Sequence, residues 1–309
     1  MRWVVGVDLR PGNDGPLQFA AWLMRQVGVG GVAVEGVHVL ERDSLSFALT
    51  LAGGAEAEGL HFPGADGALA SARDALAAAL ARVDVAATVR AEVTVAANIE
   101  EHLIGLVARA PGDGLVVGRR ALRGEDHRFV RLGRVTRRLL RALPGPVVVV
   151  PPDLKAERIG DGPLLAATDL HDDSLPACRF AAELAARLGR KLVLVHVVPA
   201  PELWAPEFFP AARHAELRAA LERRGAEALA RWSEAHGLSA HEAIVTTGDV
   251  VDRLIFHAAE HDAPAVVCGS RRLSPVTRVF VASVASELAA SAWRPVIVVP
   301  PASAKESSR

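Results

Sequence analysis

Two aspartates stand where a short apolar run ends. Asp8 follows the run Trp3 to Val7, and Asp169 follows the run Leu164 to Thr168. A carboxylate after a strand can accept hydrogen bonds from a nucleoside base or ribose. Asp is also a common helix N-cap, where it accepts a hydrogen bond from a backbone N–H of the first turn. The sequence therefore gives each aspartate two interpretations, a ligand contact and a helix cap.

Small and hydroxyl residues follow a later apolar run and precede the last helical segment. Gly269-Ser270-Arg271 comes after Ala265 to Cys268, and Ala282-Ser283-Val284 opens the final helical pattern. Free backbone N–H groups and the helix dipole both favour an anion at such a helix start. These two segments predict a phosphate subsite.

His257, Glu260 and His261 have the spacing of the inverted zincin motif, two histidines four apart with an adjacent glutamate. A catalytic zinc needs a further protein ligand and an open coordination position. We interpret the segment as an ordinary helix end and expect no metal beyond nucleotide-bound Mg²⁺. His38 and His196 lie inside apolar strands, so we interpret them as hydrogen-bonded core residues and not as ligands.

The segment from 119 to 141 holds nine arginines against Glu125 and Asp126, although the whole chain has a net charge of −1. Arg131, Arg134, Arg138 and Arg141 recur at spacings of three and four and would share one helix face. The favoured interpretation is a solvated face whose arginines pair with acidic helices of the same domain. The alternative is an anion site for a nucleotide, a polyphosphate or nucleic acid, of which nucleic acid ranks last because few aromatic residues are interleaved.

The elements that must position these residues occur twice. The same landmarks recur in the same order, with the second copy about 150 residues after the first. The pairs are Val7 to Leu9 with Thr168 to Leu170, Phe19 to Leu23 with Phe180 to Leu184, His38-Val39 with His196-Val197, Val93-Thr94 with Val245-Thr246, Val117-Gly118 with Cys268-Gly269, and Pro146 to Pro152 with Pro295 to Pro301. Six landmarks in one order indicate an internal repeat.

Within each repeat, β-branched apolar runs alternate with segments of helical period. The predicted strands are 3–7, 32–40, 86–95, 114–117 and 146–150, then 164–168, 191–198, 240–246, 265–268 and 295–299; the predicted helices of the first repeat are 16–27, 68–82, 99–109 and 133–143. Strands that are apolar on both faces and joined by helices indicate a parallel sheet covered on both sides. The predicted fold is α/β, with two repeated, doubly wound, five-stranded parallel-sheet domains of Rossmann-like type. The predicted domains are 1–152 and 163–301, with a linker at 153–162 and a disordered tail at 302–309.

Composition excludes several classes of protein. The chain has no Tyr and only two cysteines, Cys178 and Cys268, both in apolar stretches typical of buried thiols in a reducing compartment. No apolar stretch reaches the ~18 residues that a membrane span needs, and Asp8 comes too early for a signal peptide. P-loop and Gly-x-Ser-x-Gly motifs are absent from the sequence. We therefore expect a cytoplasmic protein that does not contact membranes and is not an enzyme.

The chain resembles the universal stress protein (UspA) family over nearly its whole length, twice, and more strongly in the second repeat. The residues that carry the resemblance are the first strands ending in Asp8 and Asp169, Leu194 to Val197, Thr247 to Ile255, Ala259 to Ala263 leading into Val266 to Arg271, and Arg294 to Val299. The resemblance implies a fold like that of the adenine nucleotide alpha hydrolases, together with binding of ATP or another adenine nucleotide.

ATP-binding members of that family carry Gly, two residues, Gly, nine residues, Gly, then Ser or Thr. By resemblance the nucleotide-binding residues of the second repeat would be Asp169, Val197, Gly269, Ser270, Arg271, Ser283 and Val284. Arg272 and Ala282 replace two of the three glycines there. A side chain at either position stands where the backbone should approach a phosphate.

The first repeat departs further from the pattern. Its corresponding residues would be Asp8, Val39, Gly118, Gly133 and Arg134, with the second glycine lost, Gly133 displaced by an insertion, and Arg134 in place of the hydroxyl residue. The second repeat is therefore the better candidate for a nucleotide.

The resemblance implies a stress-response factor whose last strands, Val147 to Val150 and Val296 to Val299, pair within the chain as a pseudo-dimer, with homodimerisation as a further expectation. Two alternatives stay open, a weak ATPase or nucleotidyl-type enzyme on the same fold and a nucleotide-independent scaffold with vestigial sites. The segments Glu41 to Gly67 and Pro199 to Pro210 are candidates for lids or partner surfaces, and packing in the core is the alternative for them.

Overall fold

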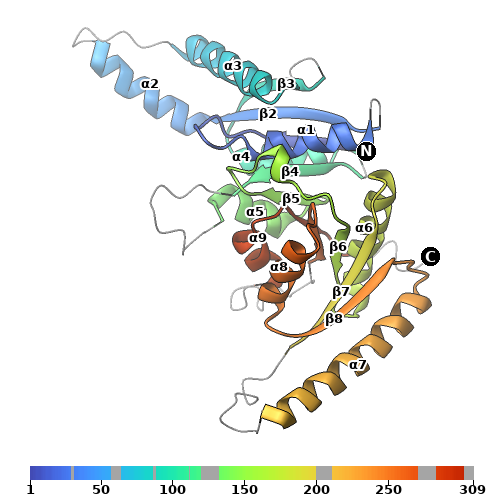
Figure 1. Ribbon diagram of the computed structural model, residues 1–309. Helices are drawn as coiled ribbons and strands as arrows, with labels where there is room; N and C mark the ends of the chain where they lie inside the picture. The colour runs from blue at the N-terminus through green and yellow to red at the C-terminus, as the bar shows by residue number, and fades with distance from the viewer. Residues whose placement is uncertain are drawn as a thin grey trace. The chain divides into compact units, whose positions relative to one another are not determined.

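The computed structural model divides the chain into two compact units, Met1–Arg158 and Ile159–Arg309, both of α/β architecture (Figure 1). The structure describes residues 1–28, 31–56, 64–85, 88–110, 112–119, 132–199, 211–270 and 283–302. The division between the units falls inside the segment 153–162, part of which forms the 3₁₀ turn η1 (Ala156–Arg158).

Unit 1 is built on a parallel sheet whose strands, within the described residues, follow the order β3-β2-β1-β4-β5. The strands are β1 (Arg2–Gly6), β2 (Ala33–Glu41), β3 (Arg90–Ala96), β4 (Gly114–Gly118) and β5 (Val147–Val150). All four residues of β5, and the first four of β4, are buried, because helices cover the sheet on both faces.

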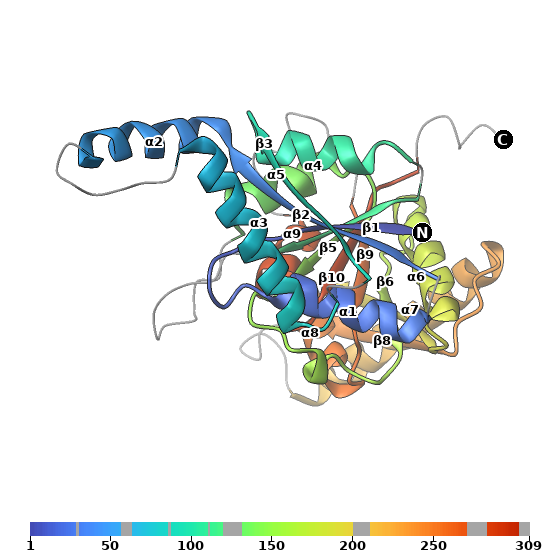
Figure 2. The same ribbon diagram turned by 90° about the horizontal axis from the view of Figure 1, so that it is seen from above.

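The helices of unit 1 connect these strands in the manner of a doubly wound sheet. They are α1 (Gly15–Val27), α2 (Arg42–Glu56), α3 (Ala65–Arg82), α4 (Ile99–Val107) and α5 (Arg134–Ala142). Pro16 occupies the first turn of α1, where its missing N–H costs no hydrogen bond, and the side chain of Asn98 caps α4 through the N–H of Glu101. Helix α2 follows β2 directly and projects beyond the sheet of its unit in both ribbon views (Figures 1 and 2).

Unit 2 has the same topology in its described residues, with strand order β10-β9-β6-β7-β8 and parallel pairing. Its strands are β6 (Leu164–Ala167), β7 (Leu192–Pro199), β8 (Glu242–Gly248), β9 (Val266–Gly269) and β10 (Val296–Val299). Its helices are the 3₁₀ turn η2 (Asp172–Ser174), α6 (Leu175–Arg187), α7 (Ala211–Ala235), α8 (Val250–Glu260) and α9 (Val284–Ser291). Helix α7 packs along β7 and β8 (Figure 1).

The winding of each sheet reverses at its first strand. Strand β1 pairs with β2 on one side and β4 on the other, and β6 pairs with β7 and β9 in the same way. In open α/β sheets, ligands bind beyond the carboxyl ends of the strands at this reversal. The fold therefore places the predicted site residues at one edge of each sheet, and the fold class predicted from sequence is confirmed.

Three sequence expectations need correction or restriction. The predicted strand 86–95 begins later, at Arg90, because Val85, Thr88 and Val89 form a hydrogen-bonded turn; residues 86 and 87 lie outside the described residues. The segment 41–67, interpreted as a lid or partner surface, contains helix α2, which the sequence analysis did not predict. Residues 200–210, with Trp204, Phe208 and Phe209, and the tail 303–309 lie outside the described residues. No helix in the described part of the chain is long and apolar enough to cross a bilayer.

Candidate functional site

In unit 2, the sheet brings several of the predicted site residues to its carboxyl edge. Thr168 donates its backbone N–H to the carbonyl of Val195 (3.0 Å), so Asp169, just after β6, lies beside the last part of β7, which contains Val197. Ser270 donates its N–H to the carbonyl of Val299 (3.1 Å), which fixes the exit from β9 beside β10.

Gly269 provides a close approach between β9 and the segment that follows Asp169. A Cβ atom at Gly269 would lie 3.1 Å from the carbonyl oxygen of Asp173 and 3.3 Å from Cα of Ser174. Any larger residue would push η2 away from the strand end. The glycine therefore has a packing role in unit 2 whether or not a phosphate binds there.

Ser283 and Val284 begin α9, as predicted. The hydroxyl of Ser283 accepts a hydrogen bond from the N–H of Ser286 (3.2 Å) and contacts the Ser286 hydroxyl (3.0 Å), so it acts as the helix N-cap. The side chain of Val284 is partly exposed. Arg271, Arg272 and Ala282 lie outside the described residues.

Asp8 and Asp169 form the same local turn. Each accepts the backbone N–H of the residue two positions on, Arg10 for Asp8 and His171 for Asp169, at 3.1 Å in both cases. This is the Asx-turn pattern, in which a side chain organises the chain that leaves the strand. Neither aspartate caps a helix, so the capping interpretation is wrong for both.

Unit 1 contains a cavity of about 360 Å³ at the carboxyl edge of its sheet. Its lining includes the five residues that the sequence predicted for this repeat, together with His38 and the polar residues Arg10, Asn13, Arg119 and Thr136; the five are Asp8, Val39, Gly118, Gly133 and Arg134. Ligand pockets in proteins are commonly of this size or larger. The structure therefore brings the predicted residues of the first repeat together around one space.

The carboxylate of Asp8 is already committed to protein partners. Arg10 Nε donates to both carboxylate oxygens (2.9 and 2.8 Å), Arg10 Nη2 pairs with Oδ2, and Asn13 Nδ2 donates to Oδ2 (2.9 Å). Burial alone would raise the pKa of Asp8, but the hydrogen bonds and charge of Arg10, helped by Asn13, hold that pKa below its usual value. The sequence analysis did not single out Arg10 or Asn13, although the Asp-x-Arg spacing was the available signal.

The described arginines of the segment 119–141 have identifiable surroundings. Arg134 Nη2 pairs with Glu41 Oε1 (2.6 Å), and Arg138 pairs with Glu100 on α4. Arg119 is buried; burial lowers its pKa, and the charge of Asp153 partly offsets this. For Arg138 the predicted pairing with an acidic helix is confirmed, whereas Arg134 pairs with Glu41 at the end of strand β2; residues 120–131 lie outside the described residues.

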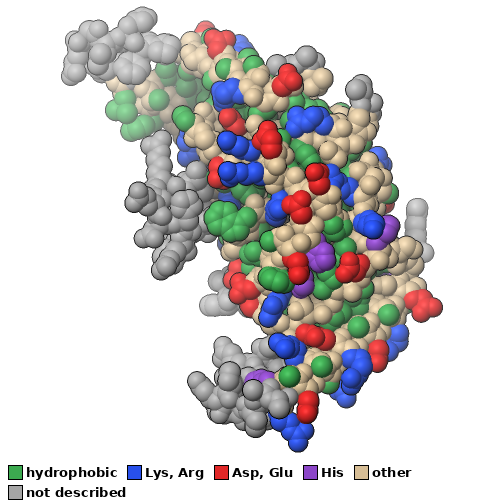
Figure 3. Space-filling model, viewed as in Figure 1, with side chains coloured by type: hydrophobic (Ala, Val, Ile, Leu, Met, Phe, Trp, Pro, Cys, Tyr) green, Lys and Arg blue, Asp and Glu red, His purple; other side chains and the backbone are tan. Residues whose placement is uncertain are grey.

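Three further features concern the start of α5 and the charged surface. Thr136 donates its hydroxyl to the carbonyl of Gly118 (2.9 Å), which ties the start of α5 to the end of β4. On the face shown in Figure 3, basic and acidic side chains of the described residues are interspersed. Gly133 holds the N-cap position of α5 with an extended backbone and no side-chain cap.

His38 and His196 are hydrogen-bonded within their own units, as predicted. Nδ1 of His38 bonds the carbonyl of Val7 (2.8 Å), and Nδ1 of His196 bonds the carbonyl of Thr168 (2.9 Å). Both cysteines are buried, and burial raises the pKa of each thiol to about 12. At that pKa neither thiol supplies a nucleophilic thiolate near neutral pH.

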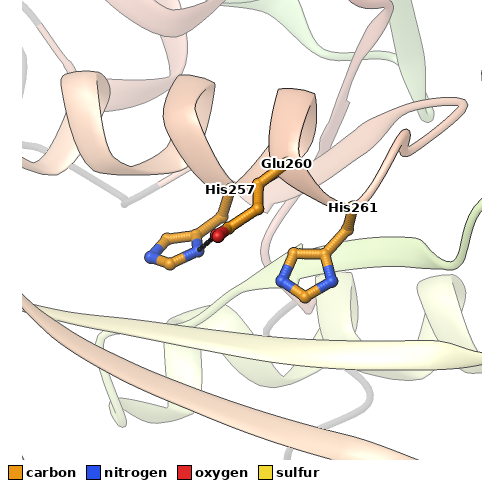
Figure 4. Close-up of side chains that lie close together, drawn as sticks. All are labelled: His257, Glu260 and His261. Atoms are coloured by element: carbon orange, nitrogen blue, oxygen red, sulfur yellow. Dashed lines mark ion pairs between the residues drawn. The ribbon is translucent and has the colours of Figure 1, made fainter.

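The three residues of the HxxEH motif converge at the end of α8 (Figure 4). One donor atom from each of His257, Glu260 and His261 lies within 4.8 Å of the others, and Nδ1 of His257 is 3.3 Å from Oε2 of Glu260. The side chain of His257 is 12% exposed, and neither of its ring nitrogens has a hydrogen-bond partner among the described residues. Burial is the main cause that lowers the pKa of His257.

A doubly wound parallel sheet with polar residues gathered at the winding reversal defines a Rossmann-like α/β protein, a class that binds small ligands at that edge. Residues 162–300 match the model of the universal stress protein family. This match spans almost the whole of unit 2, which is therefore similar to that family over nearly its full length.

Solved structures of similar fold match this chain over both units. A universal stress protein from Archaeoglobus fulgidus DSM 4304 is 18% identical, with a TM-score of 0.57 over 97% of this chain and 98% of that one. A Pseudomonas aeruginosa UCBPP-PA14 protein assigned to the same family is 17% identical, with a TM-score of 0.57 over 97% of this chain and 93% of that one. A universal stress protein in complex with cAMP is 27% identical over 46% of this chain and 98% of its own, with a TM-score of 0.32. No curated protein sequence matches the chain.

Proposed function

We propose that the protein is a non-enzymatic universal stress protein whose second unit binds an adenine nucleotide. The observation that carries the proposal is the convergence in unit 2 of Asp169, Val197 and Gly269 at the carboxyl edge of the sheet, where the winding reverses. The family resemblance assigns these positions to the adenine and the phosphates, with Ser270, Ser283 and nucleotide-borne Mg²⁺ completing the site.

Unit 1 presents a specific obstacle to an adenine at its aspartate. In unit 1 the guanidinium of Arg10 and the amide of Asn13 occupy the carboxylate of Asp8. At the corresponding place in unit 2, His171 follows Asp169 and donates its backbone N–H. An adenine approaching Asp8 would have to displace a charge-assisted pair, which costs binding energy.

The absence of catalysis is part of the proposal. Both cysteine thiols have a pKa of about 12, which removes the two candidate sulfur nucleophiles. A weak ATPase and a nucleotide-independent scaffold are the competing functions. Cytoplasmic localisation, pairing of the last strands 147–150 and 296–299, and homodimerisation stay predictions.

Calorimetric titration of the full chain with ATP, AMP and cAMP, with Mg²⁺ present, tests the proposal. We expect saturable binding of at least one nucleotide by the wild type, and weakening of at least about tenfold in Asp169→Ala, the loss expected for one charged hydrogen bond. Asp173→Ala, which removes an exposed carboxylate four residues away, is the matched control and should bind like the wild type.

Each competing function has its own outcome in the same experiment. Absence of heat with all three nucleotides would support the scaffold and overturn nucleotide binding. Release of phosphate from ATP that disappears in Asp169→Ala would overturn the non-enzymatic part. Nucleotide binding that is weakened about tenfold by Asp8→Ala and unchanged by Asp169→Ala would place the site in unit 1.

A further inference from the structure

The end of α8 is held in a fixed position by the segment that opens unit 2. Gly162 donates its N–H to the carbonyl of Asp262 (2.9 Å), and Asp161 donates its N–H to Oδ2 of Asp262 (2.9 Å). Arg294 Nη2 pairs with Oδ1 of the same carboxylate (2.7 Å). A Cβ at Gly162 would overlap the carbonyl oxygen of His261, so the two backbones are in direct contact. These contacts therefore fix the position of the helix end at which His261 lies.

The histidine pair at this helix end differs from the structural histidines of the same chain. His38 and His196 each bond a strand carbonyl through Nδ1, which accounts for their presence inside a sheet. The side chain of His257 is 12% exposed; its Nδ1 faces Oε2 of Glu260 at 3.3 Å, and neither ring nitrogen makes a hydrogen bond within the described residues. A buried nitrogen without a hydrogen bond is costly, and a cation bound beside it is one of the few explanations for it.

The chemistry of the three donors matches that of a transition-metal site. Residues at positions i, i+3 and i+4 share one face of a helix, and Figure 4 shows the three side chains projecting from the same end of α8, with Glu260 beside the His257 ring. Two imidazoles and one carboxylate suit zinc and its neighbours, whereas Mg²⁺ and Ca²⁺ prefer sets of oxygen ligands. The negative end of the helix dipole adds a favourable field for a cation.

We propose that His257, Glu260 and His261 bind one divalent transition-metal ion of the Zn²⁺ class, with water in the remaining coordination positions. Bond lengths of about 2.0–2.2 Å require donor atoms of a tetrahedral site to lie about 3.3 Å apart. The three donors lie within 4.8 Å of one another, and Nδ1 of His257 is already 3.3 Å from Oε2 of Glu260, so modest side-chain rotation brings the set to that spacing. The proposal does not rest on nucleotide binding, since α8 carries none of the residues assigned to the nucleotide.

The test uses the full chain, without an affinity tag, stripped with a chelator and titrated with ZnCl₂ in the absence of nucleotide. We expect one Zn²⁺ per chain by calorimetry and a rise in thermal midpoint, because the ion binds only the folded state. Glu260→Gln and His261→Gln should each weaken binding about tenfold or more. His241→Gln, which removes an exposed histidine of the same unit, should bind like the wild type.

A second measurement separates lost ligands from lost structure. Co²⁺ bound by the wild type should show the visible absorption of a tetrahedral site, and Glu260→Gln should abolish it while its metal-free circular dichroism stays that of the wild type. Zn²⁺ binding by Glu260→Gln and His261→Gln at wild-type affinity would overturn the proposal, as would no binding by the wild type.

Discussion

The pair Glu100–Arg138 offers the sharpest test of how the arginine-rich helix α5 contributes to unit 1. Glu100 on α4 is 3% exposed, and its Oε2 is buried without a hydrogen-bond partner among the described residues, so Arg138 is the countercharge for a buried carboxylate. Replacing Arg138 by Met keeps most of the aliphatic stem and removes only the charge.

Breaking a buried ion pair from one side typically costs about 3–5 kcal/mol, because the other charge stays buried and unpaired. Arg138 itself is 49% exposed, so water can reach one side of the site and reduce the penalty. We therefore expect Arg138→Met to lower the free energy of unfolding by about 2 kcal/mol. For a unit of about 150 residues this lowers the thermal midpoint by about 4–8 °C in differential scanning calorimetry.

Two further variants make the result specific. Arg137→Met removes a neighbouring exposed arginine on the same helix and should change the stability by no more than about 0.5 kcal/mol. Glu100→Gln combined with Arg138→Met removes both charges and should recover part of the loss. If Arg138→Met is no more destabilising than Arg137→Met, the argument that α5 arginines neutralise buried acid in unit 1 is refuted.

Two more predictions follow from local geometry. The folded-state pKa of Asp8 lies below its unfolded value of about 3.9, so its contribution to stability is present above about pH 4 and is lost as the pH falls through the folded-state pKa. The free energy of unfolding in urea should therefore differ between Asp8→Asn and the wild type by about 0.2–1 kcal/mol at pH ~6 and by less at pH ~2. An equal difference at both pH values would contradict the assignment. Gly105→Ala, at an exposed position of α4 with nothing within 4 Å of the added Cβ, should stabilise the protein by up to about 1 kcal/mol. Gly162→Ala should destabilise it by about 1–3 kcal/mol, because its Cβ meets a backbone carbonyl. The same unfolding assay checks both variants, and changes of the same sign would refute the reasoning.

The fold could be predicted from sequence because its signals are redundant. Buried parallel strands such as Val147–Val150 and Val296–Val299 are apolar at every position, and two copies of each landmark support one another. Helix α2 escaped prediction for the opposite reason. Phe47 and Leu51 are 67% and 59% exposed, so its apolar residues do not form the buried stripe by which a helix is recognised.

The sequence could predict which residues line the site. It could not predict which side chains pair with one another there. Topology fixes which residues follow a strand, and Asp8, Val39, Gly118, Gly133 and Arg134 all line one cavity. The partner of a carboxylate depends on distances that no spacing rule gives. Glu41, at the end of β2, is far from Arg134 in the sequence, yet the two form an ion pair. The pair neutralises the charge of an arginine that lines the cavity.

The two units show how one fold can carry different sites at the same edge. In unit 1, Arg10 pairs with Asp8 and Glu41 pairs with Arg134, so two of the predicted site residues already have partners of opposite charge within the protein. In unit 2, the strand ends present Asp169 and Gly269 in the same topology, with His171 where unit 1 has Arg10. A repeat whose copies share backbone geometry can therefore differ through one or two side chains, and Arg10→His is the most direct way to release Asp8 from its charged partner.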